Sequence, residues 1–428
     1  MPLFSILMPS RNRGHLLAES VKTILGQDFS DYELIISDNN STDHTKQVAE
    51  SVMEKSSQCR YVNPGKDLSM VDHFEFISTK ANGDYLLFLS DDDGLIDKGL
   101  RYLAEVINTA PHNPEIIVWQ RAGYGWPDLG DHPNCEYLAF RLRSGKTFEV
   151  KSSLIIDALC NFDAAPNIHF VGPKITNCAI SRIAFARPMK RTGRFFLPPY
   201  PDYSTLCQLL STHSSYTLID QPLYICGSSV AANSAIHTGR KKKIAEYNSL
   251  FSPEEITLDA VRYPMEFLTN SAICATYMKF QRLYPETFTA NVNWRNYLAA
   301  LYAELEYHEH FEDTTAEMEQ LRIFMRQETG DDTFFDSLCN TVKGGNRRAA
   351  ILYQLRKLAA TNAATRLLTS TTMRLLGIKN SDARQFSHVK DIVTAASIVT
   401  GELTKVGRLT TTLPTERLDR PEQLTLLA

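Results

Sequence analysis

The stretch Tyr85-Leu86-Leu87-Phe88-Leu89-Ser90-Asp91-Asp92-Asp93-Gly94 joins a short, continuous apolar run to three adjacent carboxylates and a glycine. The apolar run predicts a strand that is buried on both faces. Three neighbouring anions repel one another and lose solvation when they are buried, so they favour a positive partner. Oxygen ligands of this kind suit Mg²⁺ or Mn²⁺, which bind one or two carboxylates and complete their shell with water and phosphate oxygens. A divalent-cation site and a solvated acidic turn are the two interpretations of this stretch.

Length, charge and cysteine spacing narrow the class of protein. The 428 residues suffice for two or three domains, and 45 basic against 49 acidic residues leave a net charge of −4, which argues against a nucleic-acid-binding protein. The eight cysteines are scattered without a Cys-x-x-Cys pair, which fits a reducing cytoplasm and neither a zinc site nor a disulfide framework. Met1-Pro2 leads straight into a predicted strand, and no apolar run approaches the ~18 residues of a membrane span. We therefore expect a cytoplasmic protein, soluble or peripheral on the inner face of the membrane.

Strand and helix patterns alternate through the first part of the chain. Apolar runs at 3–8, 32–37, 60–62 and 85–89 predict strands, and each is followed by apolar residues at helical spacing. Short alternation of this kind predicts an α/β fold, with a Rossmann-like, mostly parallel sheet flanked by helices.

Polar clusters follow three of these strands. They are Pro9 to Arg13, Asp38 to Asp43, and Asp91 to Asp93. Ligands of parallel sheets bind beyond the carboxyl ends of the strands. The three clusters are therefore expected to meet at one edge of the sheet.

The order and spacing of these segments resemble a known family. The segments are Met8-Pro9-Ser10-Arg11-Asn12-Arg13, Ile36-Ser37-Asp38-Asn39-Asn40-Ser41-Thr42-Asp43, and Ala81-Asn82-Gly83-Asp84-Tyr85 running into Ser90-Asp91-Asp92-Asp93. Together they resemble the nucleotide-binding half of an inverting family 2 glycosyltransferase with the GT-A fold. The resemblance covers roughly the first 110 residues well and continues more weakly to about residue 240. It implies a GT-A domain over 1–240, with a nucleotide-binding half at 1–110 and an acceptor half at 111–240.

The resemblance also implies roles for individual side chains. The nucleotide-binding residues are Pro9, Arg11, Asn12, Asp38 and Asp91, and the metal ligands are Asp92 and Asp93. Asp38 would accept a hydrogen bond from the base, which suits the N3 hydrogen of uracil or thymine; its alternative role is an Asx-turn before the next helix. Asp43 is expected to cap that helix. The family often has a further aspartate at Ser90, and Asp93 has two alternatives, ligation through water or capping of the helix that follows.

A catalytic base is needed because an alcohol is a poor nucleophile until its proton is removed. The family places a carboxylate at the start of a helix, usually in a Glu-Asp pair after a glycine-aromatic segment. Thr192-Gly193-Arg194-Phe195-Phe196-Leu197-Pro198-Pro199-Tyr200-Pro201-Asp202 has this form, with Pro201 where the family commonly has Glu. We predict Asp202 as the base; its alternative role is to cap the helix.

Two later segments carry further predictions. The small, polar stretch 227–243 ends in a basic run, and a lid with His237 as an additional metal ligand stands beside the simpler interpretation of a solvated charged surface. From about residue 244 the alternation stops, which predicts a helical C-terminal region over 241–409 and a loose tail over 410–428. Between Lys343 and Asn380 the chain has cations and leucines but no carboxylate. This segment predicts peripheral membrane contact through 343–380, or a helical subdomain that packs its leucines internally or against a partner.

The resulting functional hypothesis is a Mn²⁺- or Mg²⁺-dependent enzyme that transfers a sugar from a nucleoside diphosphate, with UDP preferred, to a hydroxyl of a glycan or glycolipid, in cell-surface polysaccharide or glycolipid synthesis. Asp91-Asp92-Asp93-Gly94 also resembles the Asp-x-Asp-Gly signature of haloacid dehalogenase-like phosphatases, although that family opens its domain with this strand. A catalytically silent sugar-nucleotide-binding protein is the third alternative. A dinucleotide-dependent oxidoreductase is disfavoured because no Gly-x-Gly-x-x-Gly follows the first strand.

Overall fold

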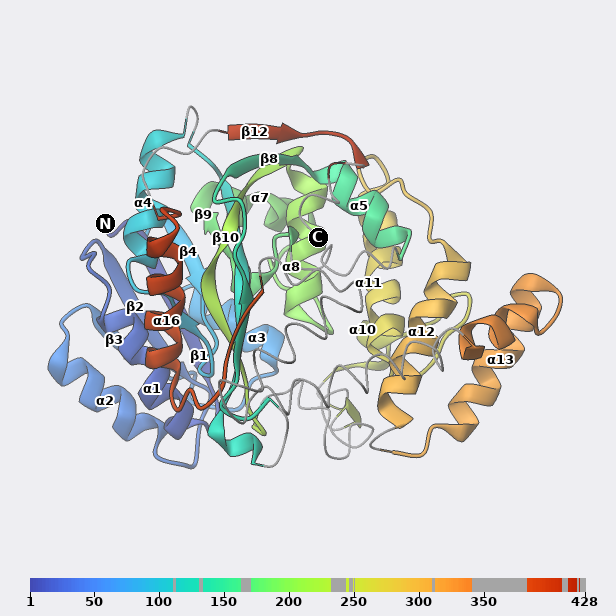
Figure 1. The fold of residues 1–428 in the computed structure, drawn as a ribbon, viewed down its shortest axis with the longest axis horizontal. Coiled ribbons are helices and arrows are strands. Elements are labelled where there is room, and N and C mark those ends of the chain that lie inside the picture. Colours follow the sequence, from blue (N-terminus) through green and yellow to red (C-terminus); the bar gives the residue numbers. More distant parts are fainter. Residues whose placement is uncertain are drawn as a thin grey trace, which may run out of the picture.

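The computed structural model describes residues 1–110, 113–130, 134–162, 171–231, 244–245, 249, 251–309, 312–340, 383–409, 415–421 and 423. The strands, in chain order, are β1 (Phe4–Ser10), β2 (Tyr32–Asp38), β3 (Cys59–Val62), β4 (Tyr85–Phe88), β5 (Gly94–Leu95), β6 (Ile116–Gly125), β7 (Leu138–Arg141), β8 (Thr147–Lys151), β9 (Cys178–Ser181), β10 (Ser215–Ser228), β11 (Ala383–Phe386) and β12 (Thr415–Leu418). All of them join one sheet with the main order β12-β8-β10-β6-β9-β4-β1-β2-β3. Figure 1 shows this sheet in the middle of the molecule, with helices on both sides.

The four strands predicted in the first 90 residues form the parallel part of the sheet. β1 pairs in parallel with β2 and β4, and β3 pairs in parallel with β2. Every residue of β2 and β4 is buried, as expected for strands with helices on both faces. Beyond β4 the sheet becomes mixed, because β9 runs antiparallel to both β4 and β6. The predicted α/β class, with a Rossmann-like sheet flanked by helices, is confirmed.

The helices are α1 (Gly14–Leu25), α2 (Thr45–Lys55), α3 (Met70–Ser78), α4 (Gly99–Thr109), α5 (Ser152–Cys160), α7 (Arg182–Thr192), α8 (Pro201–Thr212), α10 (Pro253–Ile256), α11 (Thr269–Leu283), α12 (Trp294–Glu309), α13 (Thr315–Thr329) and α16 (Ile392–Lys405), with short 3₁₀ turns η1 (Pro127–Leu129) and η2 (Ile175–Asn177). These helices fall into two groups, and each group packs in its own hydrophobic core. Helices α1, α2, α4 and α16 contribute to the core on one face of the sheet, and α3, α5, α7, α8 and α11 to α13 contribute to the core on the other.

The helical region after residue 250 does not form a separate core. The buried hydrophobic residues of α11 to α13 belong to the same cluster as those of α5 and α8. Polar contacts join the parts as well, since Tyr284 donates its hydroxyl hydrogen to Gln208 Oε1 at 2.9 Å and the Asn293 amide donates to the Cys160 carbonyl at 2.9 Å. Helices α11 to α13 therefore extend the fold outward from α8, as Figure 1 shows on the right.

The end of the chain returns to the sheet. Helix α16 packs against α1 and β10, on the opposite face from α11 to α13 (Figure 1). Strand β11 pairs with β7, and β12 pairs in parallel with β8 inside the segment expected to be a loose tail. Helical spacing in the sequence indicates that a helix has an apolar face, but it does not indicate which face of the sheet that helix covers.

The predictions for residues 343–380 and for His237 lie outside the described residues. Within the described part of the chain, no helix combines the length and the apolar character needed to cross a bilayer.

Candidate functional site

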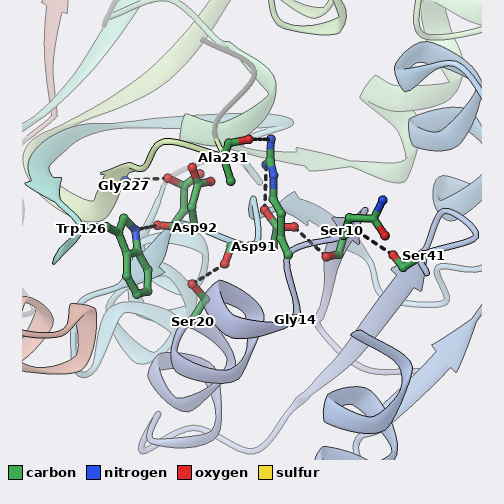
Figure 2. A network of polar contacts seen from close by, with 12 residues as sticks. Ser10, Gly14, Ser20, Ser41, Asp91, Asp92, Trp126, Gly227 and Ala231 are labelled. Atoms are coloured by element: carbon green, nitrogen blue, oxygen red, sulfur yellow. Dashed lines mark hydrogen bonds and ion pairs between the residues drawn. The ribbon is translucent and has the colours of Figure 1, made fainter. Parts of the chain in front are cut away.

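The carboxyl ends of β1, β2 and β4 meet at one edge of the sheet. Ser10, the last residue of β1, lies opposite Asp38, the last residue of β2. The Ser10 hydroxyl also donates to Asp91 Oδ2 at 2.7 Å, in the loop that follows β4. Figure 2 shows Ser10 and Asp91 facing each other across this edge. The predicted convergence of the three polar clusters is therefore confirmed.

Asp91 is held on both carboxylate oxygens. Its Oδ2 accepts from Ser10, and its Oδ1 accepts from Arg13 Nη1 at 3.0 Å, in an ion pair whose carboxylate side chain is 1% exposed. Burial lowers the pKa of Arg13, but Asp91, Asp92 and Asp93 raise it, and the net pKa lies above its ordinary value. Arg13 thus stays charged and offsets part of the negative charge of the loop.

Sequence reasoning missed Arg13. Its other terminal nitrogen, Nη2, donates to the Ala231 carbonyl at 2.6 Å and so ties the loop after β1 to the segment after β10 (Figure 2). The sequence feature that could have identified Arg13 is its position as a second arginine, two residues after Arg11. Arg11 itself is exposed and pairs with Asp67 at 2.6 Å.

Asp92 is a buried carboxylate with negative neighbours. Its backbone carbonyl accepts from Trp126 Nε1 at 2.8 Å, which holds the loop against the end of β6. The side chain is buried, and burial followed by the repulsion of Asp91 raises its pKa to about 6, although Arg13 and Ser90 act in the opposite direction. A buried carboxylate of this kind favours the arrival of a cation.

Asp93 anchors the loop to β10. Its Oδ1 accepts from the Gly227 amide at 2.8 Å, and its Oδ2 accepts from the Tyr224 hydroxyl. Burial and Asp92 raise its pKa well above the ordinary value, despite these two donors. Gly227 is required by close approach, because a Cβ there would lie 1.8 Å from the Asp92 carbonyl oxygen. Glycine, which has no Cβ, leaves room for the loop at this point.

The predicted nucleotide residues form a hydrogen-bonded pair of loops beside this site. The Asp38 carboxylate accepts from the Ser41 amide and the Tyr61 hydroxyl, each at 2.9 Å. Asn12, with a φ of 53°, donates its amide to Ser41 Oγ at 2.8 Å and accepts from the Thr42 amide at 2.7 Å. The loops after β1 and β2 therefore hold each other in place.

Two further predicted residues of these loops are placed by the structure. Pro9 lies opposite Ser37 in the register of β1 and β2. Asp43 accepts from the amides of Thr45 and Gly14, each at 2.9 Å. These amides belong to the first residues of α2 and α1, so Asp43 provides an acceptor at the start of both helices, whereas their N-cap residues are His44 and Arg13.

Asp202 lies in the first turn of α8, directly after Pro201 at the first helical position. The Lys174 ammonium lies 4.5 Å from the ring centroid of Tyr203. Burial raises the pKa of Asp202, while Lys174 and Arg121 lower it, with a net increase. Burial lowers the pKa of Lys174 to about 8, against the opposing effect of Asp202.

Cys226, on β10, contacts Arg121 and interacts electrostatically with the carboxylate loop. Arg121 Nη1 lies 3.3 Å from the Cys226 sulfur. Burial, then Asp93, raises the pKa of this thiol to about 11, with Arg121 lowering it and Asp92 raising it further. We refer to Arg121, Lys174, Asp202 and Cys226 as the Asp202 cluster. Electrostatic interactions with Asp92 and Asp93 put Cys226 near the carboxylate loop, while Arg121 and Lys174 lie near Asp202.

A divalent cation fits the carboxylate loop only as a site shared with a ligand. Among the described residues, no group of three or more His, Cys, Asp or Glu side chains could enclose a metal ion. The oxygens of Asp91 and Asp93 already accept from neighbouring donors, so Asp92 is the carboxylate best suited to a cation. Mg²⁺ and Mn²⁺ sites with one or two carboxylates, completed by phosphate and water, have this composition.

Comparisons with known proteins agree with the fold of the first part of the chain. Residues 5–164 match the family model described as glycosyl transferase family 2. A GalNAc(5)-diNAcBac-PP-undecaprenol beta-1,3-glucosyltransferase from Campylobacter jejuni is 34% identical over 109 residues, which are 25% of this chain and 35% of that protein. A PGL/p-HBAD biosynthesis glycosyltransferase from Mycobacterium bovis is 30% identical over 119 residues, 28% of this chain and 46% of that protein. The chain thus matches less than half the length of these relatives.

Solved structures resemble the chain more distantly. The crystal structure of S. aureus TarS 1–349 in complex with UDP-GlcNAc has 16% sequence identity and a TM-score of 0.45, and the match covers 77% of this chain and 93% of that chain. The same fragment in complex with UDP gives a TM-score of 0.43.

Proposed function

We propose that this protein transfers a sugar from a nucleoside diphosphate sugar to a hydroxyl group, because residues 5–164 match the model described as glycosyl transferase family 2. UDP is the donor nucleotide that we propose, and a glycan or glycolipid is the acceptor. The relatives with biosynthetic names point to glycolipid or polysaccharide synthesis. Neither alternative from the sequence has support: the strand before Asp91 is the fourth of the chain rather than the first, and the matches are transferases rather than phosphatases or binding proteins.

The observation that carries the proposal is the presence of two carboxylates, Asp92 and Asp202, in different electrostatic environments. Asp92 is buried among like charges, with a pKa of about 6. Asp202 lies at the start of α8 with Lys174 and Arg121 near it. Arg121 also lies beside Cys226, which interacts electrostatically with Asp92. Pairs of titratable groups in contrasting environments are typical of sites that divide charge stabilisation from proton transfer.

The donor nucleotide would occupy the loops after β1 and β2. Asp38 keeps a fixed orientation through Ser41 and Tyr61, and its carboxylate would accept the N3 hydrogen of uracil. Pro9, Arg11 and Asn12 line the same loops, and Asp91 would face the ribose or the phosphates. These groups are held by hydrogen bonds within the protein, which reduces the ordering cost of binding.

A divalent cation, Mn²⁺ or Mg²⁺, would be held by Asp92, with Asp93 behind it as the anchor of the loop. When bound, such an ion neutralises charge on the departing nucleoside diphosphate. Asp92 would also orient the diphosphate relative to the sugar. Ser10 and Arg13 would keep Asp91 in place while the ligand enters.

Asp202 would act as the base. Lys174 and Arg121 lower its pKa against the effect of burial, which favours the carboxylate form that can take the acceptor proton. The acceptor oxygen then attacks the anomeric carbon as the bond to the diphosphate breaks, and Asp202 holds the proton. One displacement inverts the anomeric configuration. Membrane-linked acceptors would also give the basic segment 343–380 a role at the inner membrane surface.

The proposal is tested by incubating the full chain with UDP-, GDP- and TDP-sugars, with Mn²⁺, Mg²⁺ or EDTA, and with glycan and glycolipid acceptors. We expect one donor to stabilise the protein thermally only with metal, acceptor-dependent release of the nucleoside diphosphate, and a product whose anomeric configuration is opposite to that of the donor. Absence of transfer from every donor would refute the function, and retention of configuration would refute the single displacement.

A further inference from the structure

The segment that leads to Asp202 is held by a carboxylate from the nucleotide-binding half. Glu75, on α3, accepts from the Phe195 amide at 3.2 Å and from the Phe196 amide at 3.0 Å, both at Oε2. The Phe195 amide also lies 3.3 Å from Oε1. These contacts span about 120 positions in sequence and join α3 to the loop before α8.

These two amides need a partner because the surrounding segment is buried. The side chains of Phe195 and Phe196 are 0% exposed, and a buried amide without an acceptor costs stability. Prolines follow at 198, 199 and 201 and offer no amide hydrogen to organise the segment. An ionised acceptor makes stronger hydrogen bonds than a neutral one, so Glu75 is well suited to fix this segment.

The segment is tied to α8 at its other side. The Leu197 amide donates to Ser204 Oγ at 3.1 Å, and Gln208 Nε2 donates to the Phe195 carbonyl at 3.2 Å. Displacing the backbone of Phe195 and Phe196 would therefore move the first turn of α8, which carries Asp202. The Phe196 ring also packs edge-to-face on Phe88 of β4, at 5.4 Å between centroids.

Helix α3 is itself attached to the predicted nucleotide loops. The segment just before it contacts them through Asp67, which pairs with Arg11 at 2.6 Å and accepts from Asn40 Nδ2 at 2.9 Å. The next residue, Leu68, exchanges two hydrogen bonds with the side chain of Asn39. Glu75 thus belongs to a helix whose start is fixed by the nucleotide loops and whose second turn holds the segment before Asp202.

We infer that Glu75 is a positioning residue for Asp202, setting the place of the proposed base relative to the donor loops. Its effect on transfer rests on the proposed function, whereas its effect on the backbone of 195–204 does not. Small displacements of a reacting group lower rates strongly, by roughly 100-fold for about 1 Å. A positioning residue should therefore change kcat and leave donor binding intact.

The test compares Glu75→Ala and Glu75→Gln in the full chain, each with and without Asp202→Asn. We expect Glu75→Ala to lower kcat for transfer about 10- to 100-fold, with the donor KM changed by less than about twofold. In the Asp202→Asn background, measured at high enzyme concentration, the same change should cost less than about twofold. Glu75→Gln keeps one oxygen acceptor and should lose less activity; it also provides the comparison if Glu75→Ala does not fold.

Asp72→Asn is the matched control. Asp72 lies one turn earlier on α3 and pairs with Arg194 at 2.6 Å, on side chains that are 49% and 31% exposed. Exposed pairs contribute little, so we expect its kcat to change by less than about twofold. Equal losses for Glu75→Ala in both backgrounds, a parallel rise in the donor KM, or an unchanged kcat would each overturn the inference.

Hydrogen exchange separates this inference from the proposed function. In Glu75→Ala the amides of Phe196 and Leu197 should exchange at least about tenfold faster, while those of residues 38–43 stay unchanged. Unchanged exchange at Phe196 and Leu197 would overturn the positioning role. A wild-type protein that transfers no sugar from any donor would refute the proposed function, and the exchange measurement would still decide how Glu75 holds the segment.

Discussion

The carboxylate loop and the Asp202 cluster carry opposite charge excesses. The loop brings Asp91, Asp92 and Asp93 together with one guanidinium, Arg13. In the Asp202 cluster, Arg121 and Lys174 surround one carboxylate. The excess of negative charge in the loop therefore favours the binding of a cation. The Asp202 cluster instead contains its own cations, and these lower the pKa of a carboxylate that burial raises. Four substitutions test this contrast.

The largest effect is expected for Asp202→Asn. Removing the carboxylate leaves no acceptor for the proton of the incoming hydroxyl, so transfer should fall by about 100- to 10,000-fold. Donor affinity should stay within about twofold, because the nucleotide loops do not contact α8 through Asp202. Transfer assays and donor titration measure the two quantities separately. Transfer at the wild-type rate would exclude Asp202 as the base, and the Asp202 cluster would then have no catalytic role to compare with the carboxylate loop.

Asp92→Asn should affect binding and stability in opposite directions. Loss of the carboxylate should weaken metal-dependent donor binding by about 100-fold. Without metal, the variant should be more stable by about 3 kcal/mol, because the pKa of about 6 means that the ionised Asp92 opposes folding at neutral pH. Thermal denaturation with and without donor and Mn²⁺ checks both.

Asp91→Asn is the matched variant for this stability measurement. It removes the charged partner of Arg13 and should destabilise the protein by about 3 kcal/mol, because a buried guanidinium loses its carboxylate. If both variants change stability in the same direction, the contrast between a compensated Asp91 and an uncompensated Asp92 is wrong.

The smallest effect is expected for Lys174→Met, as a shift in the pH profile. Asp202 must be ionised to act as a base, and Lys174 lowers its pKa. Removing this cation raises the pKa, so the acidic limb of kcat should move to higher pH by about one unit. Initial rates of transfer between pH 5 and 9 give this limb. A shift to lower pH, or none, would show that Lys174 does not act on Asp202 electrostatically.

The fold of the first 110 residues could be predicted because its signals are local. Apolar runs identified β1, β2 and β4, and the helical spacing of Leu17, Val21 and Ile24 agrees with α1. The place of Asp38 at the sheet edge followed from the rule that polar clusters at parallel strand ends converge. The return of α16 to the opposite face could not be predicted in this way, because a helical period indicates an apolar stripe but not its partner.

In the candidate site, too, the features that depend on neighbouring residues could be predicted and the long-range contacts could not. The sequence by itself determined that carboxylates follow a buried strand and that Asp202 begins a helix, since burial, repulsion and helix starts depend on neighbouring residues. Only the tertiary structure decided that Arg13 neutralises Asp91, that the Gly227 amide holds Asp93 across 134 positions, and that Glu75 holds the approach to Asp202. Such contacts join elements through the packing of the sheet and its helices, and no local pattern of residues specifies which distant donor meets which carboxylate.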